Sequence, residues 1–257
     1  MVIMKRNEPL INLFGLILII LLAVLVYLAL TDSGQGLTML SADLEQRVSY
    51  SYLLKNVTAA GQTENQHGQA EVILGREDYE NGAVNIVTAI VTDYRMLDTF
   101  GEILVLFAAS AGVGLLMVER KRGKAKEASE IVKTAVPIII LFTLITGFYI
   151  ISHGHLTPGG GFPGGAVIAS AFILQFLAFQ KSSRNKVFKI LESLAGIGLL
   201  AMGLIGLYLE GSLFANFLPN GSLGATISAA GIMIIYALIG IKVAAELSSI
   251  SADFIGE

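Results

Sequence analysis

The sequence contains no cysteine among its 257 residues. Without thiols the chain can form no disulfide bond, no iron–sulfur ligation and no thiolate zinc site. Any redox chemistry connected with this protein must therefore belong to a partner, and we expect no cofactor to be bound by the chain itself. Histidine is also scarce, with only His67, His153 and His155.

Charged residues are few, at 14% of the chain, whereas soluble domains average about 25%. Hydrophobic residues make up 54% and are grouped in long runs, and runs of roughly 18 or more indicate transmembrane helices. We predict an all-α, polytopic membrane protein with about six crossings. The first run exceeds the usual apolar core of a signal peptide, so we expect it to be retained. The expected spans are Leu10–Leu30, Thr99–Val118, Ile131–Ser152, Gly164–Gln180, Ile190–Leu209 and Leu223–Leu247.

The charges are segregated along the chain. Basic residues gather at 5–6, 120–133 and 181–189, whereas segments 31–98, 153–163 and 210–222 are acidic or neutral. Lys and Arg mark the cytoplasmic side, so this alternation predicts both termini in the cytoplasm. The same reasoning makes the basic segments markers of topology near anionic lipid, and no nucleic acid is expected as a partner.

One stretch, His153–Gly165, is unusually rich in glycine. It contains Pro158, Gly159, Gly160, Gly161, Pro163, Gly164 and Gly165 between two long apolar runs. So many glycines imply close backbone approach or positive φ at several positions. Irregular backbone at membrane depth survives only where protein or trapped water satisfies its polar groups. We therefore expect a compact turn packed against neighbouring helices inside a larger assembly.

Ionisable residues within membrane spans are costly and are candidates for function. Asp98 and Glu102 open the second span and could cap that helix or line the outer mouth of a cation path. Lys242 and Glu246 lie four residues apart, on one face of the last span. They could snorkel to the cytoplasmic headgroups or form a proton or cation relay. Glu192 opens the fifth span, where we favour a stabilising role at the helix N-terminus.

The paired histidines of the glycine-rich stretch do not make a metal site by themselves. A metal site needs three or four ligands, and no nearby Cys, Asp or Glu supplies them for His153 and His155. A neutral, hydrogen-bonding histidine is the better interpretation. His155 could therefore take part in transport or proton relay, or it could anchor the loop.

Residues 154–165, reading GHLTPGGGFPGG, resemble the signature loop of the B subunit of the multisubunit Mrp (Mnh) Na+/H+ antiporter. The Leu191–Leu194 segment and the 240–245 ending also resemble that subunit, and the resemblance covers 131–247. Many antiporter members have Asn where this chain has Leu156. The sequence is therefore closer to the branch found in archaeal membrane-bound hydrogenase and sulfur-reducing complexes.

The preceding segment resembles a different subunit. Residues 85–95 and 98–102 are similar to the C-terminal end of the large A subunit, although Met96 replaces the family's usual Gly. In the archaeal complexes this end is a separate small subunit. The resemblance thus implies two modules, 1–120 with two spans and an external loop, and 121–257 with four spans.

The resemblance implies a non-catalytic subunit that helps move Na+ coupled to H+ transport, with no active site of its own. Expected partners are the C-, D-, F- and G-like small membrane subunits, hydrogenase-like redox subunits and lipid. A sodium path would use Asp98, Glu102 and His155, with Lys242 and Glu246 near it. The alternative is a purely structural scaffold that bridges the ion-pumping subunits. A self-sufficient permease is disfavoured because spans 1–3 and 4–6 show no convincing internal repeat.

Overall fold

The structure, a computed structural model, describes residues 20, 24, 81–117, 128–179 and 186–255. The chain divides into two compact units, Met1–Ser51 and Tyr52–Glu257. In the first unit, the described residues Ile20 and Val24 are helical and exposed. The predicted first span, Leu10–Leu30, otherwise lies outside the described residues.

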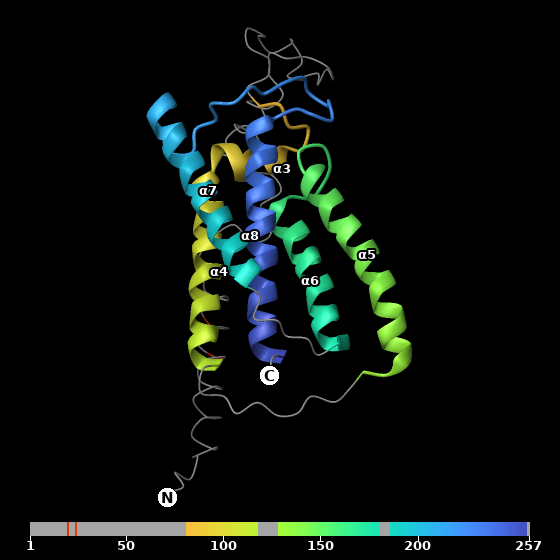
Figure 1. The fold of residues 1–257 in the computed structure, drawn as a ribbon. Helices are drawn as coiled ribbons and strands as arrows, with labels where there is room; N and C mark the ends of the chain where they lie inside the picture. The colour runs from red at the N-terminus through yellow and green to blue at the C-terminus, as the bar shows by residue number, and fades with distance from the viewer. Residues whose placement is uncertain (1–19, 21–23, 25–80, 118–127, 180–185, 256–257) are drawn as a thin grey trace, which may run out of the picture. The chain divides into compact units, whose positions relative to one another are not determined.

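The described part of the second unit is helical, with no strand, which confirms the all-α prediction there. Five of its helices are long and apolar enough to cross a membrane. They alternate in direction along the chain, as Figure 1 shows, so segments 81–95, 153–160 and 211–229 lie together at one end of the bundle. In order, the elements are α3 (Ile86–Ala89), the π-helix η3 (Ile90–Tyr94), α4 (Met96–Met117), α5 (Glu130–Ser152), α6 (Gly161–Phe179), α7 (Lys186–Glu210) and α8 (Ala230–Ile255).

Helix α8 is the centre of the bundle. Helices α4, α5, α6 and α7 all contact it, and Figure 1 shows α6 and α7 on either side of it. In the most apolar 18-residue segment of α8, 61% is buried, compared with 6% in that of α4 and 11% in that of α5. The main core joins Ile239 and Val243 of α8 to Leu199 of α7 and Ile103 of α4. The outward faces of α4 and α5 are therefore left for lipid or partner subunits.

The last helix does not lie where the sequence predicted it. The expected span was 223–247, but α8 runs from Ala230 to Ile255. Residues before Ala230 form an irregular connection with positive φ at Gly221, Gly224 and Ala229. The backbone N–H of Ala229 also donates to Asn220 O at 2.6 Å. Apolar composition continues through this connection, which is why hydropathy alone placed the start too early.

The glycine-rich stretch is a loop only as far as Gly160, because Gly161 begins α6. Gly160 has φ +137°, which favours glycine. The later glycines allow helices to touch. A Cβ at Gly164 would lie 2.5 Å from Ile151 Cγ1 of α5, and one at Gly161 would lie 2.5 Å from Tyr236 O of α8. The predicted close backbone approach is confirmed, whereas the predicted extent of the loop to Gly165 was wrong.

Candidate functional site

Lys242 and Glu246 form a buried ion pair in the middle of the central helix. Lys242 lies twelve residues after α8 begins and thirteen before it ends. Its Nζ donates a hydrogen bond of 3.2 Å to Glu246 Oε2. The lysine is 7% exposed and the glutamate 0%. Because α8 continues well beyond both residues and both are buried, the structure disfavours the alternative in which they snorkel to the cytoplasmic headgroups.

A second carboxylate reaches the same lysine from α7. Glu192 Oε1 lies 3.9 Å from Lys242 Nζ, and the Glu192 side chain is 16% exposed. The ring of Phe107, on α4, has its centroid 5.1 Å from the same nitrogen, within the range of a cation–π contact. Three helices therefore meet at one ammonium group, and we call Glu192, Lys242 and Glu246 the buried triad.

From the sequence we expected Glu192 only to stabilise the start of its helix, and this interpretation missed its contact with Lys242. Helix α7 begins at Lys186, so Glu192 lies beyond the first turn, where the helix dipole acts most strongly. A signal was available in the sequence. Glu192 and Glu246 were each expected at the cytoplasmic end of a span, in antiparallel helices, which puts them at a similar depth.

The triad holds two carboxylates and one ammonium group away from water. Burying an ion pair is costly, and an uncompensated buried charge costs more. Lys242 engages Glu246 Oε2, while Glu246 Oε1 is buried and accepts no hydrogen bond within the described part of the chain. With all three groups ionised the triad carries one negative charge in excess. A proton or a monovalent cation at this oxygen would balance that charge.

A polar network joins the other end of α8 to two loops. Tyr236 OH donates a 2.9 Å bond to Thr88 Oγ1, which donates a 2.6 Å bond to Gly154 O. Asn85 Nδ2 donates to Gly154 O and to Thr157 O at 3.0 and 2.9 Å. The segment that resembles the A-subunit end is thus bound to the loop that resembles the B-subunit signature.

His155 lies in this network, outside the helices, and is 1% exposed. Its backbone oxygen accepts from Asn85 N at 3.0 Å, and its Nε2 is buried without a hydrogen-bond partner among the described residues. Burial lowers the pKa of His155 below its usual value, although hydrogen bonding to the backbone of Ala225 and Thr226 acts in the opposite direction. The side chain is therefore neutral at physiological pH, as the sequence interpretation expected of a hydrogen-bonding histidine.

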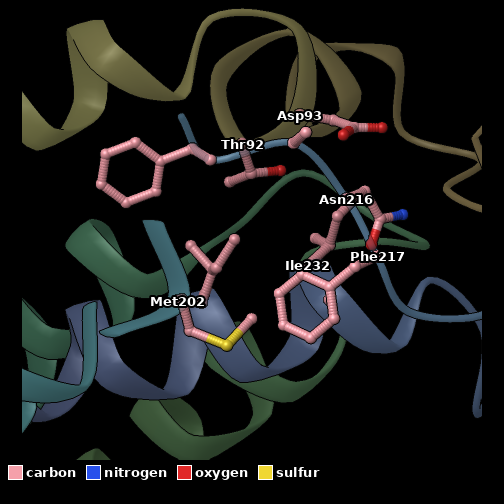
Figure 2. A pocket seen from close by; sticks show the side chains of 10 residues that line it. Thr92, Asp93, Met202, Asn216, Phe217 and Ile232 are labelled. Carbon is pink, nitrogen blue, oxygen red and sulfur yellow. The ribbon is translucent and has the colours of Figure 1, made fainter. Parts of the chain in front are cut away.

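A pocket opens beside the network, and its residues were not singled out from the sequence. Figure 2 shows Thr92 and Asp93 facing Met202, Asn216 and Ile232 across it. Its volume is about 10 Å³, at the lower limit for holding one water molecule. An adjoining depression of about 450 Å³ shares Asp93 and Asn216 and is also lined by Asn220. Two asparagines in the short 211–229 connection are the signal that could have found it.

The two remaining candidates lie on α4. Asp98 forms an ion pair with Arg95, and both side chains are more than half exposed. Glu102 is exposed one turn later. Phe107, which contacts Lys242, follows Glu102 by five residues, or about 7.5 Å of helix rise. Asp98, Glu102 and Phe107 thus follow one another along α4, and of these Phe107 contacts the triad. Among the described residues, no group of three or more His, Asp or Glu could hold a metal.

Long apolar helices around a buried charged triad define the class of this chain, a multi-pass membrane protein with ionisable groups at membrane depth. Residues 131–249 match the family described as "Domain related to MnhB subunit of Na+/H+ antiporter". These residues form a domain related to that antiporter subunit, and the resemblance to the B subunit is confirmed there.

Two individual relatives are similar to parts of the chain. An uncharacterized protein of Methanocaldococcus jannaschii is 32% identical over 52% of this chain and 60% of its own length. An antiporter subunit named mnhB2 from Staphylococcus haemolyticus is 45% identical over 27% of this chain and 45% of its own length. The chain thus matches less than two thirds of the length of either relative.

Two solved structures have the same fold. A chain of the membrane-bound sulfane sulfur reductase, an archaeal respiratory membrane complex, is 38% identical with a TM-score of 0.71. The match covers 95% of the present chain and 99% of that one. A chain of the Mrp complex from Dietzia sp. DQ12-45-1b has a TM-score of 0.62 at 20% identity, over 100% of this chain and 27% of that one. This second likeness concerns the fold alone.

Proposed function

We propose that this chain is a non-catalytic membrane subunit of an Mrp-type cation/proton antiporter module within an energy-converting respiratory complex of the hydrogenase or sulfur-reducing type. Its role is to contribute to Na+ translocation coupled to H+ transport. Its partners are the C-, D-, F- and G-like membrane subunits and the redox subunits of that complex. The match over 99% of a chain of the sulfane sulfur reductase supports this assembly, and the buried triad supports the transport role.

The single observation that carries the transport role is the burial of Glu192, Lys242 and Glu246 in membrane-spanning helices. Apolar side chains would fill the same space without the cost of desolvating three charges. Such groups mark ion pathways or proton relays in membrane proteins. Because Glu246 Oε1 has no hydrogen-bond donor in the described chain, Na+ and a proton can compete for one carboxylate. Competition for a shared site is a simple way to couple the two ions.

A transport assay on the assembled complex tests this proposal. Glu246→Gln keeps the size of the side chain and removes its charge. In proteoliposomes holding the complex, we expect Na+ uptake to fall by about tenfold or more, the effect of ~1.4 kcal/mol on a barrier. The matched control is Glu130→Gln, which alters a Glu–Lys pair at the exposed start of α5, where Glu130 is 88% exposed. Unchanged Na+ uptake in a fully assembled Glu246→Gln complex would refute the role of the triad.

The second candidate is a scaffold that bridges the ion-pumping subunits. It is favoured by the network in which Asn85 and Thr88 bind the backbone of Gly154 and Thr157. In that case, changes at the triad would reduce the amount of complex on a native gel, while the complex that does form would keep its full transport rate. The roles of Asp98 and Glu102 as ion ligands remain predictions. If Glu102→Gln leaves the Na+ dependence of transport unchanged, Glu102 does not belong to the sodium path.

A further inference from the structure

An apolar crevice runs along α8 on a different face from the triad. Its floor consists of residues of α8 that are small except for Ile241, and its walls consist of bulky side chains from α5, α6 and α7, including Phe148, Phe172 and Leu191. Its volume is about 370 Å³, within the range of roughly 300–1,000 Å³ that is common for small-molecule sites. The side chains that line it are all apolar. On α8 the lining residues are Ala237, Gly240, Ile241, Ala244 and Ala245.

The crevice exists because of the way helices pack on α8. Helices α6 and α7 lie on either side of α8 in Figure 1. Phe172 of α6 and Phe188 of α7 both line the crevice, with their rings in edge-to-face contact and 5.0 Å between the centroids. From Ala237 to Ala245 the floor rises by about 12 Å along the helix axis. An empty apolar crevice at membrane depth would lose dispersion contacts along its whole length. Some apolar group must therefore fill it in the assembled protein.

The lower end of the crevice is marked by positive charge. Phe188 lines it, and Phe188 lies in the first turns of α7 together with Lys186 and Lys189. Both lysines are exposed, and they flank Phe188 along the chain. The predicted topology puts this end at the cytoplasmic face, where ammonium groups contact anionic lipid headgroups.

From this juxtaposition we propose that the crevice is a binding site for one acyl chain of an anionic phospholipid, whose headgroup contacts Lys186 and Lys189. Lipid tails are as apolar as the leucine and phenylalanine walls, so the match is chemical as well as steric. A helix of a partner subunit fits less well, because a helix with side chains is about 10–12 Å across. A partner helix also gives no reason for the two ammonium groups at the end of the crevice.

Native mass spectrometry of the purified complex tests this site, after exchange into detergent micelles that contain equal amounts of phosphatidylglycerol and phosphatidylcholine. The key variant is Ala237→Phe, because Ala237 is exposed and lines the crevice. The matched control is Ala201→Phe, at an exposed alanine of α7 outside the crevice. We expect the wild-type and control complexes to retain phosphatidylglycerol, and Ala237→Phe to lower its occupancy by about tenfold.

The headgroup contact has its own test. The double variant Lys186→Gln/Lys189→Gln should retain less phosphatidylglycerol than the wild type. The control variant Lys133→Gln, at the start of α5, should retain as much as the wild type. Equal retention of phosphatidylcholine would overturn the anionic part of the proposal. Loss of a partner subunit from both Ala237→Phe and the smaller Ala237→Leu, with Ala201→Phe intact, would overturn the proposal as a whole. That result would show that protein, not lipid, occupies the crevice.

Discussion

Tyr236 of α8 donates a hydrogen bond to Thr88, a residue 148 positions earlier in the chain. Thr88 in turn donates to Gly154 O, so a single side chain connects the central helix, the 81–95 segment and the glycine-rich loop. All of these atoms are buried, and a buried polar group that loses its partner costs free energy. This relationship makes the network testable one bond at a time.

Tyr236→Phe removes one bond and leaves Thr88 bonded to Gly154, so we expect a loss of ~0.5–1.5 kcal/mol of stability. Thr88→Val removes both bonds and leaves Tyr236 OH unpaired, so we expect a larger loss of stability, about 1–3 kcal/mol. The measurement is the temperature at which the solubilised complex loses its monodisperse peak in size-exclusion chromatography. A Thr88→Val complex as stable as the Tyr236→Phe complex would contradict the chain of bonds.

Gly164→Ala should destabilise the crossing of α5 and α6. The added Cβ would lie 2.5 Å from Ile151 Cγ1 and 2.9 Å from Gly147 O, and overpacking of this kind costs typically 1–3 kcal/mol. Gly112→Ala on α4 is the matched control, because nothing lies within 4 Å of its added Cβ. The control should be neutral or stabilising, by up to about 1 kcal/mol, through helix propensity. Equal melting temperatures for the two variants would show that the crossing is looser than described.

From the burial of His155 we predict that the folded protein becomes less stable as the pH falls. Burial lowers its pKa in the folded protein, whereas the unfolded chain takes up a proton near pH 6.5. The stabilisation is therefore complete above that pH and is lost as the pH falls below it towards the folded pKa. Between pH 7.5 and pH 5, the wild type should lose more thermal stability than His155→Gln, which cannot titrate. Identical pH profiles for the two proteins would contradict the prediction.

Lys242→Met alone should reduce the yield of assembled complex more than Lys242→Met/Glu246→Gln, in which both members of the ion pair are replaced. Alone, it leaves Glu192 and Glu246 buried without their ammonium group, and breaking a buried pair in this way costs about 3–5 kcal/mol. Lys242→Met/Glu246→Gln removes one of the two unpaired carboxylates and should recover part of that loss. Lys133→Met, in the exposed pair on α5, should stay within ~0.5 kcal/mol of the wild type. The yield of assembled complex on a native gel orders the four proteins, and a double variant worse than Lys242→Met would contradict the triad.

The sequence predicted the helices better than their ends or their contacts. Apolar runs located α4 to α8 because length and composition determine membrane spans. The start of α8 was misplaced because residues 223–229 carry no charge and several apolar side chains. The bond from Ala229 to Asn220 and several positive φ values keep this segment out of the helix. Hydropathy does not register such backbone features.

The candidate site was predicted in part. Lys242 and Glu246 could be paired from their spacing on one helix. The sequence places Glu192 at a depth similar to that of Glu246, but its contact with Lys242 depends on how α7 crosses α8 and could not be predicted. Asp93 and Asn216 were missed for a similar reason. Each is an ordinary loop or helix-end residue until the fold brings 81–95 against 211–229.

The central helix comes last among the described helices, and this has a consequence for biogenesis. Helices α4 to α7 all reach the bilayer before the surface against which they pack has been synthesised. Until α8 inserts, Glu192 is a solitary carboxylate in lipid and the α5–α6 pair has no third wall. The translocon or an insertion factor must therefore shelter the earlier segments, and a ribosome stalled before residue 230 should leave a nascent chain that is rapidly degraded.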